Sequence, residues 1–282
     1  MKTEVDELFL YRKAVTVRLE LLEMIYRAGS GHVGGALSSV DLLVVLFYAI
    51  MRYRPEEPDW PERDRFILSK GHSCEGYYVI LADRGFFPRE ELQRFMKFDA
   101  LLMGHPSPKI PGVEIATGSL GHGLSTSVGI ALAGKMDSLS YRVYCLMGDG
   151  EMTEGSVWEA AMAAAHYRLD NLVCIVDRNG LQISGPTQEV MNTEPLSSRW
   201  KAFGWETFEI DGHDIRSIRE TLLNLPRRGK PTLVIANTVK GKGVSFMEGD
   251  PRWHHRVPSE EEFRMAVAEL KGALARLDAF ME

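Results

Sequence analysis

The stretch Tyr141–Pro186 reads YRVYCLMGDGEMTEGSVWEAAMAAAHYRLDNLVCIVDRNGLQISGP, and the fold is worked out from it. Residues 143–147 are a short apolar run that stops at a Gly-Asp-Gly turn, which predicts a buried strand. Residues 154–168 carry apolar side chains at helical spacing, and a second apolar run follows at residues 172–176. This order predicts a βαβ unit, whose crossover places the two strands side by side and parallel.

Polar residues follow both predicted strands. Asp149 comes directly after the first strand, and Asn179 follows the second. Open α/β sheets bind ligands at this edge, where a helix N-terminus also offers N–H groups to an anion. Carboxylate, amide and carbonyl oxygens are ligands for Mg²⁺ or Ca²⁺, with phosphate oxygens and water completing the shell. The residues therefore predict a divalent metal that holds a phosphorylated ligand, although each turn alone would also suit an ordinary loop.

Predicted strands and helices alternate along the whole chain. A further short strand is expected within residues 64–72, before a Gly-His turn, and others at 205–210 and 232–237. Further helices are expected at 4–28, 77–82, 124–135, 197–203, 215–225 and 260–280. The sequence contains no internal repeat, low-complexity tract or linker. We therefore expect an α/β fold in one domain, residues 1–282, with a mainly parallel sheet and helices on both faces.

The composition is that of a globular protein, with 45% hydrophobic and 26% charged residues. The net charge of −6 does not favour nucleic-acid or membrane binding. Cys74, Cys145 and Cys174 lack metal or redox spacing and are expected to be buried thiols, which fits a reducing cytosol. The acidic N-terminus does not resemble a signal peptide, and the apolar run at residues 40–51 is expected to be a buried helix too short to span a membrane. We expect a cytoplasmic protein.

Glycine and histidine motifs lie on both sides of the central stretch. Residues 30–35, SGHVGG, are expected to form a loop, and the lysines of the segment 238–243 would also suit solvated charges. Together with the central stretch, the motifs resemble the thiamine-diphosphate signature in its transketolase form, in the family's order. The motifs are SGHVGG (30–35), DRFILSKGH (64–72), GHP (104–106), TGSLGHG (117–123), TVKGKG (238–243) and WH (253–254).

This resemblance implies a thiamine-diphosphate-binding (PP-type) fold and a role for individual residues. Asp149, Asn179 and the carbonyl of Leu181 would hold Mg²⁺, for which Ca²⁺ or Mn²⁺ could substitute. The implied cofactor-binding residues are His72, Gly118, Leu120, Gly148, Asp149, Gly150, Glu154, Asn179 and His254. The implied catalytic residues are His32, His72, His105 and His254.

The chain departs from the family pattern at two positions. Val33 replaces the usual proline after His32, which would leave that loop less rigid. His122 replaces a common glutamine, and only the histidine titrates near neutral pH. His213 resembles a family turn with a structural role and is therefore not included in the site.

The implied activity is that of a transketolase of the pentose phosphate pathway, which moves a two-carbon ketol unit from a ketose phosphate to an aldose phosphate. In the family, a second, pyrimidine-binding domain carries the glutamate that activates the cofactor, and nothing after His254 resembles that domain. We therefore expect an amino-terminal subunit that is inactive alone. Activity would require a carboxy-terminal partner subunit, in an α₂β₂ assembly.

Two alternatives remain. The chain could belong to another thiamine-diphosphate enzyme, either similar to deoxyxylulose-phosphate synthase or a transketolase for an unusual pentose. The motif Trp158-Glu159-Ala160 and the spacing from TVKGKG to Trp253-His254 favour a transketolase. A non-catalytic cofactor-binding module is the second alternative, but such a module would have little use for four histidines. The sequence does not indicate the sugar substrates or the residues that bind their phosphate.

Overall fold

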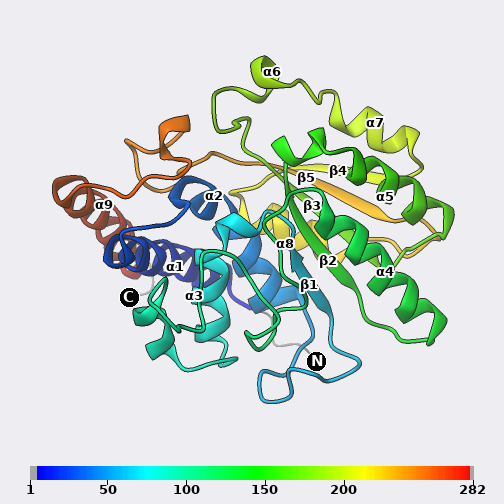
Figure 1. Ribbon diagram of the computed structural model, residues 1–282, viewed down its shortest axis with the longest axis horizontal. Coiled ribbons are helices and arrows are strands. Elements are labelled where there is room, and N and C mark those ends of the chain that lie inside the picture. Colours follow the sequence, from blue (N-terminus) through cyan, green and yellow to red (C-terminus); the bar gives the residue numbers. More distant parts are fainter. Residues whose placement is uncertain (1–4, 280–282) are drawn as a thin grey trace.

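A parallel β-sheet lies at the centre of the molecule. The computed structural model describes residues 5–279, and within them five strands pair in the order β1-β2-β3-β5-β4 (Figure 1). The strands are β1 (Arg65–Leu68), β2 (Val143–Gly148), β3 (Leu172–Arg178), β4 (Glu206–Asp211) and β5 (Thr232–Asn237). Val143 of β2 pairs with Leu172 of β3, so the predicted βαβ unit is confirmed.

Helices cover both faces of this sheet, as expected for parallel strands. One face carries α1 (Glu7–Ala28), α2 (Val33–Val45), α3 (Glu75–Asp83) and α8 (Ile215–Leu223), with α9 (Glu260–Asp278) packed on α1. The other face carries α4 (His122–Met136), α5 (Gly155–His166) and α7 (Leu196–Ala202). The short elements are α6 (Thr187–Val190), η1 (Leu46–Ile50), η2 (Gly71–Ser73), η3 (Arg89–Arg94), η4 (Gly150–Thr153) and η5 (Pro251–Trp253). The predicted helix ends at residues 4 and 280 lie outside the described residues.

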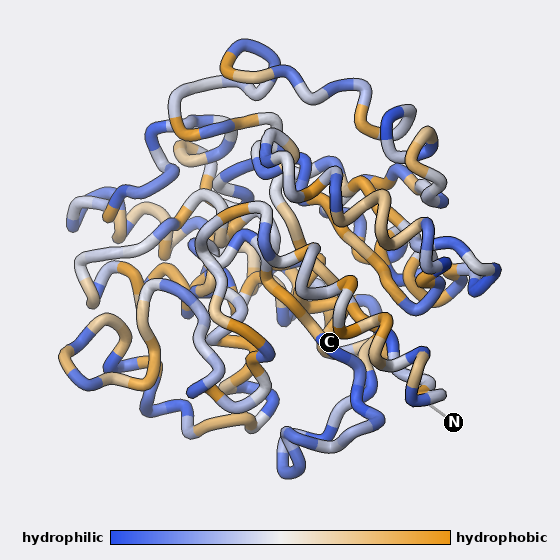
Figure 2. Tube along the Cα trace, turned by 45° about the vertical axis from the view of Figure 1, so that its right-hand side comes forward, coloured by the Kyte–Doolittle hydropathy of each residue, from blue (hydrophilic) through white to orange (hydrophobic). Residues whose placement is uncertain are grey.

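The sheet is buried because its strands present apolar side chains to both layers of helices. Along β2, Tyr144 and Leu146 pack toward one layer while Cys145 and Met147 pack toward the other. Figure 2 shows this apolar interior, with polar residues concentrated in the outer loops. Cys74, Cys145 and Cys174 are buried free thiols, as predicted.

The segment after His32 differs from the expected loop. Val33, Gly34 and Gly35 form the first turn of α2, and His32 is its N-cap residue. A Cβ atom on Gly34 would lie 2.7 Å from the carbonyl oxygen of Trp253. Glycine therefore lets the helix lie directly against the backbone near residue 253, and this packing outweighs the poor helix propensity of glycine.

Helix α2 continues directly into the π-helical turn η1. The helical stretch Val33–Ile50 begins before the apolar run expected at residues 40–51, and with 18 residues and a mean hydropathy of 2.0 it is long and apolar enough to cross a membrane by length and composition alone. However, 94% of the stretch is buried inside the fold, as the expected core helix would be. The cytoplasmic location stays a prediction.

Candidate active site

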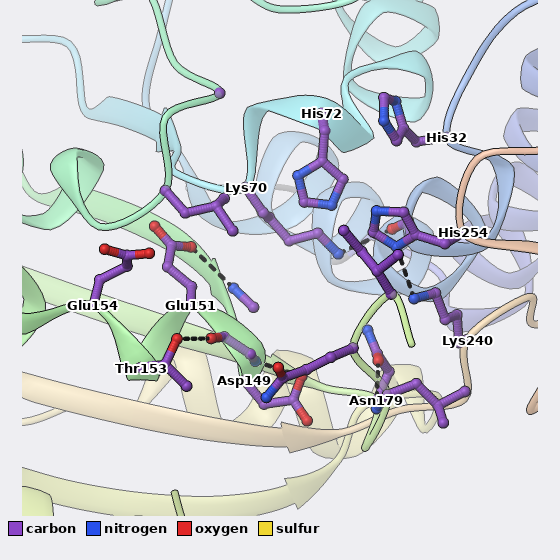
Figure 3. Close-up of a pocket in the computed structure, with 18 of the residues that line it drawn as sticks. His32, Lys70, His72, Asp149, Glu151, Thr153, Glu154, Asn179, Lys240 and His254 are labelled. Atoms are coloured by element: carbon purple, nitrogen blue, oxygen red, sulfur yellow. Dashed lines mark hydrogen bonds between the residues drawn. The ribbon is translucent and has the colours of Figure 1, made fainter. Parts of the chain in front are cut away.

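A cavity of about 520 Å³ lies at the carboxyl end of the sheet. The turns after β1, β2, β3 and β5 contribute to its walls, together with the start of α2 (Figure 3). Every residue predicted for the site lines this cavity: His32, His72, His105, Gly118, Leu120, Gly148, Asp149, Gly150, Glu154, Asn179, Leu181 and His254. The fold thus brings together segments that lie far apart in the sequence.

Asp149 is a buried carboxylate on the floor of the cavity, with only 3% of the residue exposed. Its Oδ1 accepts a hydrogen bond from the Gly150 N–H at 3.0 Å, and its Oδ2 accepts from the Gly180 N–H at 2.8 Å. Burial and the nearby Asp177 raise the pKa of Asp149 to about 6, against the lowering effect of these hydrogen bonds. Asp149 forms no salt bridge among residues 5–279, and its attraction to the ammonium of Lys240 acts at longer range.

Asn179 and Leu181 lie on the neighbouring turn after β3. The Oδ1 atom of Asn179 accepts a hydrogen bond from the Leu181 N–H at 3.1 Å, which orients the amide. Among the described residues there is no cluster of three or more His, Cys, Asp or Glu side chains that could hold a metal. Asp149 with an amide and a carbonyl oxygen nevertheless fits Mg²⁺, which usually binds few protein ligands and keeps water or phosphate oxygens. The buried Asp149 carboxylate, which forms no salt bridge among residues 5–279, supports this fit.

Four histidines line the opposite wall. The ring centroid of His32 lies 5.2 Å from that of His72, 5.6 Å from that of His254 and 6.2 Å from that of His105. Burial is the main cause that lowers their pKa values, to about 4 for His32, about 2 for His72 and about 3 for His254. These three imidazoles are therefore neutral at pH 7, and each offers one donor and one acceptor.

Two buried lysines belong to the cavity, although the sequence did not single them out. Lys240 is only 2% exposed, and its Nζ lies 2.9 Å from Nδ1 of His254. Burial and the charge of Lys70 lower the pKa of Lys240 to about 8, so it is still mainly an ammonium at pH 7. Because an ammonium only donates, Nδ1 of His254 accepts and the imidazole proton lies on Nε2. The alternative that the lysines of residues 238–243 are solvated surface charges is therefore wrong for Lys240.

Lys70 forms a buried ion pair with Asp177 at the end of β3. Asp177 also accepts hydrogen bonds from the hydroxyls of Ser38 and Thr238. Burial acts to raise the pKa of Asp177, but the ammonium of Lys70 and these hydrogen bonds lower it overall. This cluster ties β1, α2, β3 and β5 together beneath the cavity.

Glu151 is a second buried carboxylate beside the cavity. Unlike Asp149, it was not predicted from the sequence. Its Oε1 accepts hydrogen bonds from the Gly121 N–H at 2.8 Å and from the hydroxyl of Ser69, and burial raises its pKa. It joins the turn after β2 to the start of α4. The predicted Glu154 is instead exposed at the edge of the cavity, where it is the N-cap residue of α5. The motif GDGEMTEG contains both glutamates. Glu151 is buried in the fold, whereas Glu154 is exposed.

Close packing positions two of the histidines. A Cβ atom on Gly118, whose φ is 140°, would lie 2.3 Å from Cδ2 of His105, so only glycine fits beside that ring. The His32 N–H donates a hydrogen bond to Oε1 of the buried Glu75 at 2.7 Å. His122 is exposed and does not line the cavity, so its departure from the family pattern does not alter these walls.

Comparison with known proteins identifies the family. The family described as "Transketolase, thiamine diphosphate binding domain" matches residues 11–272. The chain belongs to the transketolase family. The expected cofactor-binding domain and α/β fold are therefore confirmed, and the thiamine diphosphate cofactor follows from the domain that matches.

Some similar proteins have about the length of this chain, and others are about twice as long. It is 48% identical over 262 residues to one of the subunits of the apulose-4-phosphate transketolase of Phocaeicola vulgatus, covering 93% of each chain. It is 43% identical to the 6-deoxy-6-sulfo-D-fructose transketolase subunit SqwG of Clostridium sp., covering 94% of this chain and 98% of the relative. The solved transketolase of Campylobacter jejuni superposes with a TM-score of 0.86 at 31% identity over 98% of this chain. This chain covers only 48% of that longer transketolase.

Proposed function

We propose that the chain is the amino-terminal, cofactor-binding subunit of a two-chain transketolase that transfers a two-carbon ketol unit from a ketose to an aldose. One observation carries the proposal: the residues implied for metal, diphosphate and sugar all line one cavity. Support also comes from relatives that are named as transketolase subunits, which match this chain over nearly their whole length.

The floor of the cavity would hold the cofactor through its charged end. Thiamine diphosphate, when bound, supplies the electron sink that lets a carbon–carbon bond beside a carbonyl break. Asp149, Asn179 and the Leu181 carbonyl would hold Mg²⁺, and the ammonium of Lys240 and the N–H of Gly150 would offset the negative charge of the diphosphate.

The histidine wall would handle the sugar. Neutral imidazoles can both donate to a developing alkoxide and accept a proton from a hydroxyl. Because burial lowers the pKa of His32, its neutral imidazole can accept a proton at pH 7. His254 already accepts from Lys240 at Nδ1, so its Nε2–H would donate to the sugar. His72 and His105 complete the wall and would orient the reacting carbons.

The cavity would be completed by a carboxy-terminal partner subunit. Ile183 lines the cavity together with Leu120 and the exposed Glu154, and it is 72% exposed. Relatives that match this chain over nearly their whole length are named as subunits, which supports cover of the cavity mouth by a second chain. We extend the proposal to an α₂β₂ assembly with one cavity at each contact between unlike subunits.

The donor would be a ketose with an anionic end group. The two relatives compared above are named for a phosphorylated sugar and a sulfonated sugar, respectively. Apulose 4-phosphate and the pentose phosphate pathway sugar xylulose 5-phosphate are therefore the donors to compare first.

A ketol-transfer assay tests the proposal. Each donor is supplied with ribose 5-phosphate, thiamine diphosphate and Mg²⁺, first to this chain alone and then to this chain with its candidate partner. We expect transfer only in the mixture. Transfer by the chain alone would refute the two-chain requirement. Turnover of pyruvate instead of either ketose would refute the transketolase reaction and favour a synthase.

A further inference from the structure

A second hollow adjoins the cofactor cavity. This side chamber, of about 360 Å³, is lined by three histidines and three apolar side chains: His32, His105, His255, Phe95, Met96 and Met103. His32 and His105 also line the cofactor cavity, so the two spaces share a wall. A molecule that reacts at the cofactor could therefore extend past these two histidines into the side chamber.

The chemistry of the side chamber selects a class of ligand. Burial lowers the pKa of His32 to about 4 and also lowers that of His105, so these two lining imidazoles are polar but neutral at pH 7. Phe95, Met96 and Met103 give the side chamber its apolar lining. No Lys, Arg, Asp or Glu among residues 5–279 lines it. Such walls suit a polyhydroxylated carbon chain, whose hydroxyls need donors and acceptors and whose C–H faces need apolar contact. They do not suit a phosphate or sulfonate group, which would require a cation.

His255 differs from its neighbour His254. The ring of His254 is held by Lys240, whereas His255 is exposed and makes no side-chain hydrogen bond to another residue in the range 5–279. Its ring lies edge-on to that of His32, with 4.5 Å between the centroids. The imidazole is therefore positioned at the shared wall and retains its donor and acceptor for a ligand.

We propose that the side chamber binds the hydroxylated carbon chain of the sugar, and that His255 contacts its hydroxyls and helps to determine which sugar is accepted. This inference rests on the proposed function for the presence of a sugar. It adds that the anionic end group of the sugar is bound outside the side chamber.

The first test measures turnover in the complex with the partner subunit. The variant His255→Ala should raise KM for the ketose about five- to tenfold, the effect of one lost hydrogen bond, with a smaller change in kcat. His255→Asn should recover part of this loss because an amide also donates and accepts. His166→Ala is the matched control, since His166 is exposed at the end of α5 and lines neither cavity. The affinity for thiamine diphosphate should be the same in all three variants.

The second test does not depend on turnover. Calorimetry of the same complex measures the affinities for D-arabinitol and D-arabinitol 5-phosphate, which lack the carbonyl group that reacts. His255→Ala should weaken both alcohols by the same factor, because His255 acts on the carbon chain and the phosphate is bound elsewhere. Unchanged affinities, or loss of only the phosphate contribution, would overturn the side-chamber proposal. A complex that binds both alcohols with the expected His255 effect but transfers no ketol unit would instead refute the proposed function.

Discussion

At the scale of single residues, Asp149 determines both the metal-binding capacity of the cavity floor and its cost in stability. Its carboxylate is buried, lies near the buried Asp177 and forms no salt bridge within residues 5–279. The raised pKa of about 6 means that the folded chain disfavours the anion until a cation arrives. The same feature that prepares a metal site therefore costs stability when no metal is bound.

The variant Asp149→Asn should separate these two effects. Without metal at pH 7, its free energy of unfolding should rise by about 1 to 3 kcal/mol, because the raised pKa no longer opposes folding. Its affinity for thiamine diphosphate with Mg²⁺ should fall at least about tenfold. Urea denaturation and calorimetry measure the two quantities. Asp137→Asn, an exposed change at the end of α4, is the control and should alter neither. A loss of both stability and affinity in D149N would contradict this account.

The dependence of cofactor affinity on pH follows from the same carboxyl group. The pKa of Asp149 is raised from 3.8 to about 6, so protons compete with Mg²⁺ below that pH. Affinity for the cofactor with Mg²⁺ should be constant from pH 7 to 8 and fall up to about tenfold per unit below pH 6. Calorimetry across this range measures the profile, and D149N should lack the fall. A flat wild-type profile down to pH 5 would contradict the role of Asp149.

At the scale of elements, the carboxyl end of the sheet is held by the ion pair between Lys70 and Asp177. Lys70→Met would leave the buried carboxylate of Asp177 without its cation. We expect a loss of about 3 to 5 kcal/mol in the free energy of unfolding. Lys135→Met, which removes a partly exposed pair with Asp170, should cost about 1 kcal/mol or less. Equal effects of the two variants in urea denaturation would show that the buried pair is not needed.

Much of this arrangement could be predicted because the chemistry recurs in local motifs. The turn after β2 and the turn after β3 were placed together by the rule that parallel crossovers return to the same sheet edge. The start of α2 could not be predicted, because Gly34 is helical only where the backbone of Trp253 approaches it. Lys240 was missed because a lysine in a glycine-rich loop is usually solvated, and only the fold shows its burial.

At the scale of the whole molecule, the chain provides one side of a cavity with an exposed edge. Asp149, the lysines and the histidine wall are all in place, whereas Ile183 and Glu154 at the mouth are exposed. A cofactor bound against one wall keeps much of its surface in water, so its affinity is limited until a second wall is added. The central claim is therefore that cofactor binding and subunit association are coupled, and the coupling is reciprocal.

Calorimetric titration of thiamine diphosphate in Mg²⁺ tests this claim most directly, with the chain alone and then with the partner subunit. We predict weak binding to the chain alone and an affinity at least about tenfold higher in the mixture, as coupling of about 1.4 kcal/mol or more requires. Equally tight binding in the absence of the partner would contradict a shared cavity. No binding in either titration would contradict the cofactor site itself.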